Sequence, residues 1–377
     1  MTGAEHAPFN AAMLHVLRKV YPEQAIYFYA ANSHWAEVQA ISTAQKIHFR
    51  AYKVTLQKSG KKWQWLKKFI NEASHIIRLL RRAKKQHVAL VCFSFLSPIG
   101  QYLLGMYLSL FHYPIPIIIM LHGLTILKPQ QQRKSVDRLY ATLLTKSFKR
   151  ATYAKRYVVL EQSAHYYLLK HTSLTADKLF FVPHPYLFKS VVQHIQAKQF
   201  PIQMGHLGVA RLDKRSDLFF SLAAHFQQSV TDGKIAFQVV GSILPEMRPF
   251  LSPWVISYGH EHMLHRGEYE RMCQALDYAV FCYPAEAYEL TSSGAVLDAI
   301  AFHKPIFALR TPQFEQLFSR SPTPPGMLFD DMETMKTTIM SLLESTNVKP
   351  DYDRAFVHLK HYYSVEHVAD LWKKALA

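Results

Sequence analysis

Short apolar runs of strand length alternate with helical patterns along the whole chain, and this alternation constrains the fold most. The strand-like runs are residues 25–30, 46–54, 88–95, 115–121, 157–161 and 179–183, then 205–210, 235–240, 254–258, 278–283 and 305–309. The helical patterns between them include 9–21, 61–85, 98–111, 217–228, 266–275 and 293–302, and a loop is expected at 32–35. This spacing predicts βαβ units and parallel sheets.

The length of 377 residues exceeds one ordinary core and suits two domains. Because the alternation occurs twice, we predict an α/β fold of two doubly wound, Rossmann-like domains that face a cleft. We expect the first domain at 1–200, the second at 201–350, and a terminal helix in 351–377 that packs back on the first domain. Ligands of such sheets bind at the carboxyl ends of the strands, so functional residues should lie in strand-end loops.

The formal net charge of +17 is distributed unevenly. Residues 1–200 contain 28 Lys and Arg against 7 Asp and Glu, whereas residues 201–377 contain 16 against 20. The first half therefore has a net charge of +21 and the second half −4. Such a basic half favours an anionic partner, which could be a membrane surface, a nucleic acid or a phosphorylated substrate.

Three further features bear on the compartment. Cys92, Cys273 and Cys282 are not spaced as a disulfide framework or a zinc site, and they suit a reducing, cytosolic environment. The first residues do not have the pattern of a signal peptide. Residues 98–124 are nearly all apolar, but two prolines interrupt them. We therefore expect a helix and a buried strand there rather than a membrane span.

The most informative stretch is 205–309. It contains, in order, Gly208 to Arg215 (GVARLDKR), Val240-Gly241, Gly259-His260, a strand ending at Pro284, Glu289, Ser292-Ser293-Gly294, Asp298-Ala299-Ile300-Ala301 and Lys304-Pro305-Ile306. This order and spacing resemble the donor domain of GT-B glycosyltransferases, especially those of family 4. The first half resembles the acceptor domain of that family more loosely, through strands that end at His122-Gly123 and Val182-Pro183.

The resemblance implies a nucleotide-sugar donor and assigns residues to it. Arg211 and Arg215 would hold the pyrophosphate, where cations stabilise the charge that develops on the leaving nucleoside diphosphate. Ser292, Ser293 and Gly294 open a helix whose first N–H groups can bind phosphate, although serine is also a common helix cap.

Three more residues are assigned to the donor by the same resemblance. Asp298 matches the acid that holds the ribose hydroxyls, and Gly241 and His260 lie on loops that would flank the sugar and the base. The alternative for Asp298 is a surface position on its helix. For His260 it is a structural or surface role, since the chain has 21 histidines.

The sequence departs from the family at one position that concerns the mechanism. Members carry two acids separated by seven residues, and the first lies close to the transferred sugar. Here that position is Leu290, and Glu289 precedes it. A one-residue insertion after Pro284 would bring Glu289 to the same place. The alternative is that the first acid has been lost.

Acids are scarce in the first half, where an inverting enzyme would need a general base. Glu5 is the best-placed candidate, and Glu161 is the second. His122 could orient the donor sugar or assist proton transfer, or it could be a hydrogen-bonded residue at a strand end. The family's acceptor domain begins with a strand, whereas this chain begins in the following loop, so a first strand is either missing or encoded upstream. We find no paired acids and no His/Cys cluster, and we predict no cofactor and no essential metal.

Residues 61–85 form a basic amphipathic pattern with nine Lys and Arg and one acid, Glu72. Such a helix can lie on an anionic membrane, whereas its apolar stripe is expected to cover the domain's own sheet. A second basic stretch at 146–156 adds to this surface. The residues expected at the membrane are Trp63, Trp65, Lys67, Lys68, Arg81 and Arg82.

Together these patterns predict a glycosyltransferase that moves a sugar from a nucleotide-sugar to a lipid-linked glycan or glycolipid in cell-surface polysaccharide synthesis. We expect it in the cytoplasm, peripherally attached to the inner face of the membrane, without a nucleic-acid partner. The alternatives are a non-catalytic partner subunit of the same fold that binds membrane or glycan, and a nucleotide-sugar epimerase. The sequence leaves open the sugar, base, acceptor, linkage, stereochemistry and oligomeric state.

Overall fold

The computed structural model describes residues 6–44, 47–54, 64–132, 134–150, 152, 154–188, 200–257, 264–344 and 352–376. The chain forms two compact units. Unit 1 comprises Met1–Leu187, Leu290–Ser292 and Tyr363–Ala377, and unit 2 comprises Phe188–Glu289 and Ser293–Tyr362. The first segment of unit 1 ends at Leu187, whereas the expected boundary was residue 200. The C-terminal segment is divided, because α14 (Asp353–Tyr362) belongs to unit 2 and α15 (Val365–Leu376) to unit 1.

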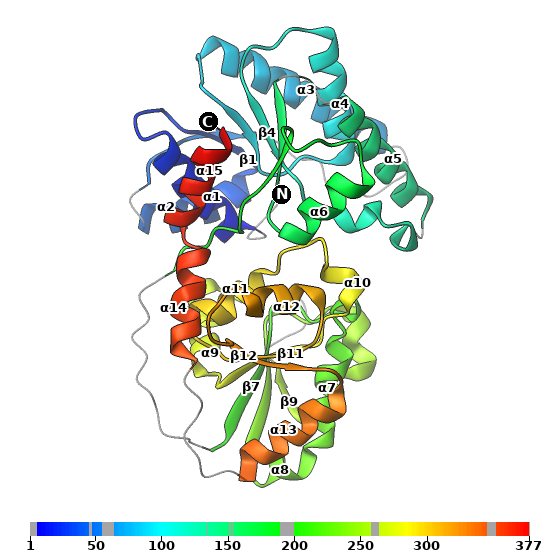
Figure 1. Cartoon of the computed structure of the whole chain (residues 1–377), viewed down its shortest axis with the longest axis vertical. Helices are drawn as coiled ribbons and strands as arrows, with labels where there is room; N and C mark the ends of the chain where they lie inside the picture. The colour runs from blue at the N-terminus through cyan, green and yellow to red at the C-terminus, as the bar shows by residue number, and fades with distance from the viewer. Residues whose placement is uncertain are drawn as a thin grey trace. The chain divides into compact units, whose positions relative to one another are not determined.

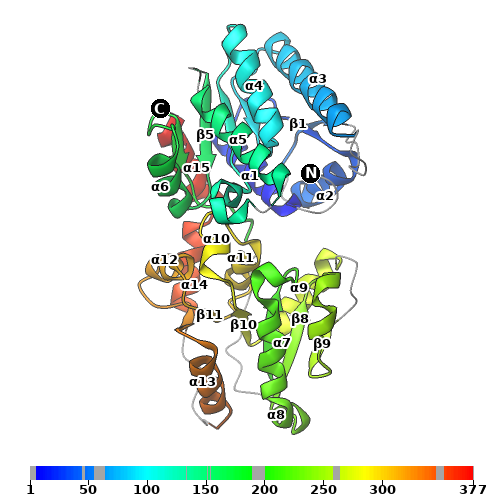
Figure 2. The same cartoon turned by 90° about the vertical axis from the view of Figure 1, so that its right-hand side faces the viewer.

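Parallel strands make up the sheets of unit 1. The strands β3 (Val91–Phe93), β4 (Ile117–Met120), β5 (Lys155–Val159) and β6 (Leu179–Phe181) form a four-stranded sheet in that order. The helices α4 (Pro98–Leu110), α5 (Ser135–Lys149) and α6 (Gln162–His171) connect them. A separate pair consists of β1 (Tyr27–Ala30) and β2 (Arg50–Lys53). Figure 2 shows α4 between α3 (Gln64–Lys85) and α5, and α4 contacts both.

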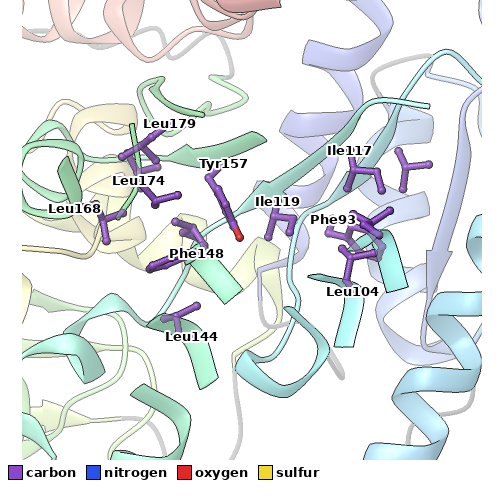
Figure 3. Close-up of a cluster of buried hydrophobic side chains, with 14 of the residues drawn as sticks. Phe93, Leu104, Ile117, Ile119, Leu144, Phe148, Tyr157, Leu168, Leu174 and Leu179 are labelled. Carbon is purple, nitrogen blue, oxygen red and sulfur yellow. The ribbon is translucent and has the colours of Figure 1, made fainter. Parts of the chain in front are cut away.

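Alternate residues of β4 point into two different cores. Ile117 and Ile119 join the cluster that α3, α4, α5 and α6 cover, and Figure 3 shows their side chains beside Phe93 and Leu104. Ile118 and Met120 join a second cluster, which α1 (Ala7–Val20) and α15 cover. Because successive side chains of a strand point to opposite faces, a strand buried on both faces has no polar positions. This explains the continuous apolar run at 115–121.

One predicted loop is a helix. Residues 32–35 were expected to form a loop, but α2 (Asn32–Ala44) begins at Asn32. Asparagine favours turns and helix N-termini alike, so the local sequence does not separate the two. The tertiary structure does, because His34 is buried and its Nε2 lies 2.7 Å from Nδ2 of Asn10 on α1.

Unit 2 has a six-stranded parallel sheet in the order β12-β11-β10-β7-β8-β9. Its strands are β7 (Ile202–Leu207), β8 (Ile235–Val240), β9 (Val255–Ser257), β10 (Tyr278–Phe281), β11 (Ile306–Leu309) and β12 (Gly326–Phe329). Counted within the unit, the order is that of a Rossmann fold, in which the winding reverses between the first and fourth strands. The predicted fold class of two parallel α/β units is confirmed.

Helices cover this sheet and connect its strands (Figure 1). They are α7 (Ser216–His225), α8 (Gln227–Thr231), α9 (Arg266–Ala275), α10 (Ala285–Tyr288), α11 (Gly294–Ala301), α12 (Pro312–Ser319) and α13 (Met332–Glu344). The turn between β10 and α11 and the turn after β7 both lie at the carboxyl edge of the sheet. This edge positions the candidate site.

The last helix of the chain is held to unit 1 by a fully buried tryptophan. Figure 1 shows α15 beside α1, and Trp372 of α15 has 0% exposure in the core that the two helices share. Truncating such a side chain leaves a cavity and typically costs about 3–5 kcal/mol of unfolding free energy.

We predict that Trp372→Ala lowers the unfolding free energy by about that amount, measured by urea denaturation of the full chain. Lys374→Ala, at an exposed position of the same helix, is the control and should change it by less than about 0.5 kcal/mol. Equal stability of the two variants would mean that α15 does not pack in this core.

Candidate functional site

The candidate site lies in unit 2, where the strand order reverses. β7 and β10 are hydrogen-bonded neighbours, and helical connections leave them in opposite directions across the sheet. Loops that diverge in this way leave room for a ligand outside the carboxyl ends of the two strands. Three segments meet at this point. They are the loop after β7, which contains Gly208 and Arg211, the turn after β10, which contains Tyr283, and the first turn of α11.

Two glycines bring the backbone of two loops into contact. Gly208 has φ +82° and Gly241 has φ +145°, values that residues with side chains rarely adopt. A Cβ on Gly241 would collide with the carbonyl group of Gly208. A Cβ on Gly208 would lie 3.4 Å from Cβ of Ala295 and 3.5 Å from Nζ of Lys214. The backbone of Gly208 is thus not covered by a side chain of its own, and it lies next to both the first turn of α11 and the Lys214 ammonium group.

Lys214 is buried, and the nearby carboxylate of Asp213 only partly offsets the loss of water around its ammonium group. Its exposure is 8%, and in the described part of the chain its ammonium group has no hydrogen bond or ion pair. Its Nζ lies 5.7 Å from the centre of the Tyr283 ring. Burial, followed by the nearby positive charge of Arg211, lowers the pKa of Lys214 to about 8. Removing a cation from water without a partner is unfavourable, so an anion beside Lys214 would be stabilising.

Arg211 supplies a second cation, and its guanidinium group contacts two other side chains. Its Nη2 donates to the hydroxyl of Tyr288 at 3.0 Å. Its Nε lies 2.6 Å from Oδ1 of Asp213, an ion pair that lacks hydrogen-bond alignment. The backbone N–H of Arg211 donates to Oγ of Ser216 at 3.0 Å, and this Oγ lies 2.9 Å from Nε2 of His206 in β7. The loop that carries both cations is therefore tied to the sheet.

The N-terminus of α11 completes the site. Ser293 is its N-cap residue, but the Ser293 side chain makes no capping hydrogen bond. Its Oγ instead lies 3.1 Å from the hydroxyl of Tyr283. A Cβ on Gly294, the first helical residue, would meet no atom within 4 Å. Helix N-terminal amides carry partial positive charge, and together with Lys214 and Arg211 they can bind an anion such as a phosphate group.

Lys214 was not among the residues predicted from the sequence to bind the donor. Arg215 was assigned to the donor, but its guanidinium group pairs with Asp217, with Nε 3.2 Å from Oδ1, at the start of α7. Lys214 occupies the buried position beside Gly208 instead. A signal was available, because the resembled family usually has lysine after its G-R-L pattern and the chain has Lys-Arg at 214–215.

Asp298 on α11 already has partners on α9. Its Oδ2 accepts a hydrogen bond from the hydroxyl of Tyr269 at 2.8 Å, and its Oδ1 lies 3.5 Å from Nη1 of Arg266. The exposure of Asp298 is 9%. Its carboxylate therefore fastens two helices together, and the assignment to ribose stays a prediction.

The segment Leu290–Ser292 belongs to unit 1. Leu290, at the position where the family pattern has an acid, is buried in a hydrophobic core of that unit. Oγ of Ser292 lies 2.7 Å from Oε1 of Glu161 and 3.2 Å from the carbonyl oxygen of Leu160, so the Ser292 hydroxyl is engaged within unit 1. Glu289, which follows α10 directly, is partly exposed. Glu5 and His260 lie outside the described residues.

His122 lies two residues after β4 of unit 1, among other aromatic rings. Its ring centre lies 5.9 Å from that of His6 and 5.5 Å from that of Phe9. Burial, followed by the neighbouring His6, lowers the pKa of His122 to about 4, although a hydrogen bond to the Ser94 backbone opposes this. Among the described residues its Nε2 has no hydrogen-bond partner, so the bond to Ser94 is made through Nδ1. At neutral pH Nε2 is thus a free acceptor.

The membrane residues are described only in part. Trp63 and the side chains of Trp65, Lys67 and Lys68 lie outside the described residues, whereas Arg81 and Arg82 are exposed on α3. In the described part of the chain no helix has both the length and the apolar character needed to cross a membrane. Among those residues no three His, Cys, Asp or Glu side chains are grouped to hold a metal ion.

Histidines that are wholly or partly buried predict an acid-sensitive fold. Burial lowers the pKa of His15 and His122 to about 4 and that of His184 and His206 to about 3, whereas their ordinary value is 6.5. Below pH 6.5 the unfolded chain binds protons that the native protein does not. Stability is therefore complete above about pH 6.5 and falls as the pH decreases towards 4.

Each additional proton bound on unfolding contributes a slope of about 1.4 kcal/mol per pH unit. We expect His184→Gln to reduce the slope of unfolding free energy between pH 6.5 and 4.5, measured by urea denaturation. His112→Gln, at an exposed position, controls for the loss of a surface histidine. A wild-type stability that does not change over this range would contradict the prediction.

No protein-family model and no curated protein matches the chain in sequence. Solved structures do match its fold. HepE of Anabaena, in complex with UDP and glucose, has a TM-score of 0.63 at 11% identity, covering 100% of this chain and 97% of HepE. WaaG, a glycosyltransferase involved in lipopolysaccharide biosynthesis, has a TM-score of 0.62 at 11% identity, covering 99% of this chain and 96% of WaaG.

The lipopolysaccharide outer core galactosyltransferase WaaB, in its apo form, has a TM-score of 0.60 at 14% identity, covering 98% of this chain and 95% of its own. At such identities the similarity concerns the fold. The chain has the fold of the GT-B glycosyltransferases, as its sequence pattern predicts.

Proposed function

We propose that this protein is a glycosyltransferase that moves a sugar from a nucleoside-diphosphate sugar to a membrane-linked glycan or glycolipid in cell-surface polysaccharide synthesis. The observation that carries the proposal is the convergence of Lys214, Arg211 and the N-terminus of α11 at the switch point of unit 2. Two cations and an open helix N-terminus suit a diphosphate better than a neutral ligand or a single carboxylate.

The chemistry of the reaction fits these groups. When the sugar leaves the donor, negative charge grows on the β-phosphate oxygens of the nucleoside diphosphate. Lys214 and Arg211 stabilise this charge electrostatically, and the buried setting of Lys214 strengthens the interaction because little water screens it. The reaction then needs no metal ion to neutralise the leaving group.

Two further groups are assigned to the reacting sugars. Glu289 is the acid next to the anion-binding residues in the sequence, and we assign it to the transferred sugar. Nε2 of His122 can accept a hydrogen bond from a sugar hydroxyl, because Nδ1 is already engaged and the ring is neutral. Glu5 remains the candidate general base.

The similar structures support the choice of donor class. HepE has been solved with UDP-glucose at a TM-score of 0.63 and 12% identity. WaaG is involved in lipopolysaccharide biosynthesis, and WaaB is a lipopolysaccharide outer core galactosyltransferase. On this basis, and because the chain has an anion site of its own, we propose a nucleotide-sugar donor and a cell-surface glycan acceptor for this protein.

The donor assignment predicts a ligand-induced increase in melting temperature. One of UDP-, GDP-, ADP- or CMP-sugars, or its free nucleotide, should stabilise the wild type by mass action. Lys214→Met and Arg211→Met should each weaken this binding about 10- to 100-fold, because each removes a charge-assisted contact. Lys234→Met is the control, since Lys234 is exposed and its Nζ lies 3.9 Å from Oδ2 of Asp232, outside the candidate site.

Binding should also weaken as the pH rises through about 8, the pKa of Lys214 in the free protein. If no nucleotide stabilises the folded wild type at low salt, the glycosyltransferase proposal fails and the non-catalytic alternative takes its place.

A membrane surface is proposed along α3 and the end of α4. Arg81, Lys84 and Lys85 are exposed on α3. Tyr113, which follows α4, donates through its hydroxyl to the carbonyl oxygen of Leu80 at 2.9 Å, so the end of α4 lies beside these cations. Leu110 is 73% exposed and Phe111 is 56% exposed at that end. Cations beside exposed apolar side chains suit an anionic bilayer.

The second basic stretch contributes less than its sequence indicates. Lys155 has 0% exposure, and its Nζ donates to the carbonyl oxygen of Ser147 at 2.9 Å in the last turn of α5. Lys146 and Lys149 are exposed on the same helix. The membrane surface is therefore expected to centre on the end of α3.

We predict that the wild type sediments with vesicles containing anionic lipid and not with zwitterionic vesicles. Lys84→Glu/Lys85→Glu should reduce the partition coefficient at least tenfold, since each cation near such a surface contributes about 1 kcal/mol. The matched control is Lys234→Glu/Arg248→Glu, which makes the same change of charge at exposed positions of unit 2. Equal losses in both variants would show that net charge, and not this surface, determines binding.

A further inference from the structure

Two stacked tyrosines lie under the anion site. The rings of Tyr283 and Tyr288 are 4.2 Å apart and inclined by 19°, and both residues are buried, with 2% and 6% exposure. Tyr283 lies two residues after the end of β10, and Tyr288 is the last residue of α10. The pair therefore connects a strand end with the short helix that follows it.

Each hydroxyl of the pair contacts a different part of the anion site. The hydroxyl of Tyr288 accepts from Nη2 of Arg211 at 3.0 Å, and that of Tyr283 lies 3.1 Å from Oγ of Ser293. The ring of Tyr283 also faces the ammonium group of Lys214 at 5.7 Å. Buried phenols need hydrogen-bond partners, and here the partners are site residues from two other segments.

The pair is itself held by the core. The Tyr283 ring centre lies 5.4 Å from that of Phe281 and 5.8 Å from that of Phe314, which is fully buried. A ring fixed between a partner ring and the core cannot change rotamer without opening the packing. The Tyr288 hydroxyl is thus a fixed acceptor for a long and otherwise flexible arginine side chain.

The nature of this acceptor matters for anion binding. Asp213 forms an ion pair with Arg211 and offsets part of the guanidinium charge that a phosphate group requires, whereas Tyr288 offsets none of it. Burial raises the pKa of Tyr288, so its phenol stays neutral at physiological pH. A neutral hydrogen-bond acceptor orients Arg211 and leaves its charge available, and a preorganised cation loses less side-chain entropy when the ligand binds.

We propose that Tyr288 is a positioning residue, which holds the Arg211 guanidinium group towards the diphosphate of the donor through a single hydrogen bond from within the stacked pair. The inference rests on the proposed function, since it concerns the same site. Tyr283 holds Tyr288 in place by stacking on its ring, and the Tyr283 ring also faces Lys214.

The test is a double-mutant cycle of Tyr288→Phe and Arg211→Met, with UDP and, in parallel, GDP as probes in calorimetric titrations. Tyr288→Phe keeps the stacked ring and removes only the hydroxyl, so it should raise the Kd about 3- to 10-fold, as expected for one neutral hydrogen bond. In the Arg211→Met background the same substitution should have no further effect, because Tyr288 acts through Arg211.

Tyr113→Phe is the matched control, because it also removes a buried, hydrogen-bonded tyrosine hydroxyl, but in unit 1. Both phenylalanine variants should lose similar stability, measured by urea denaturation, and only Tyr288→Phe should lose affinity. An unchanged Kd in Tyr288→Phe would overturn the inference, and so would effects of Tyr288→Phe and Arg211→Met that multiply. If the wild type binds neither nucleotide, the proposed function fails and this inference fails with it. Weaker binding by Arg211→Met with an unchanged Tyr288→Phe contradicts the inference alone.

Discussion

The contact between the backbones of Gly208 and Gly241 is the constraint on which the candidate site depends. A side chain at Gly241 would occupy the space of the Gly208 carbonyl group, and the positive φ angles at both positions suit only glycine without strain. Because these two loops close on one another without side chains, the Lys214 ammonium group can approach Gly208 and the first turn of α11 can lie beside it. The anion site is therefore formed by the backbone geometry of the strand ends, with the charges added to it.

The arrangement of charges in this site lowers the stability of the unliganded protein. Lys214 is largely removed from water, and Arg211 is close enough to disfavour its protonation further. A protein gains nothing in stability from such a pair, since the desolvation of a cation is compensated only by an anion. Asp213 forms an ion pair with Arg211 and favours protonation of Lys214 less than burial and Arg211 oppose it, so two cations share one acid and the site has excess positive charge. This imbalance is what a diphosphate ligand would correct.

Much of the fold follows from local patterns, and less of the site does. Continuous apolar runs such as 115–121 predict strands buried on both faces, and the alternation with helices predicts parallel sheets; both are observed. The order of the strands cannot be read locally, because it depends on which strands pair across long connections. The helix that begins at Asn32 was missed, since its start is decided by the contact of His34 with Asn10.

The candidate site was predicted incompletely for the same reason, because its contacts are made between segments that are far apart in the sequence. The G-V-A-R pattern located Gly208 and Arg211, but the choice between Lys214 and Arg215 depends on which side chain turns towards the sheet at the start of α7. Leu290 is the opposite case. Its position in the family pattern indicates an acid, but its environment is a hydrophobic core. The partners of Asp298 on α9 are likewise contacts between helices that no local pattern shows.

The central claim is that the switch point of unit 2 binds the diphosphate of a nucleotide donor. A crystal structure of the protein soaked with UDP or with GDP would test it most directly. The account predicts that the two phosphate groups lie at the carboxyl ends of β7 and β10, within hydrogen-bond distance of Lys214, Arg211 and the backbone amides at the start of α11. A nucleotide bound elsewhere, with Lys214 facing no phosphate oxygen, would contradict it.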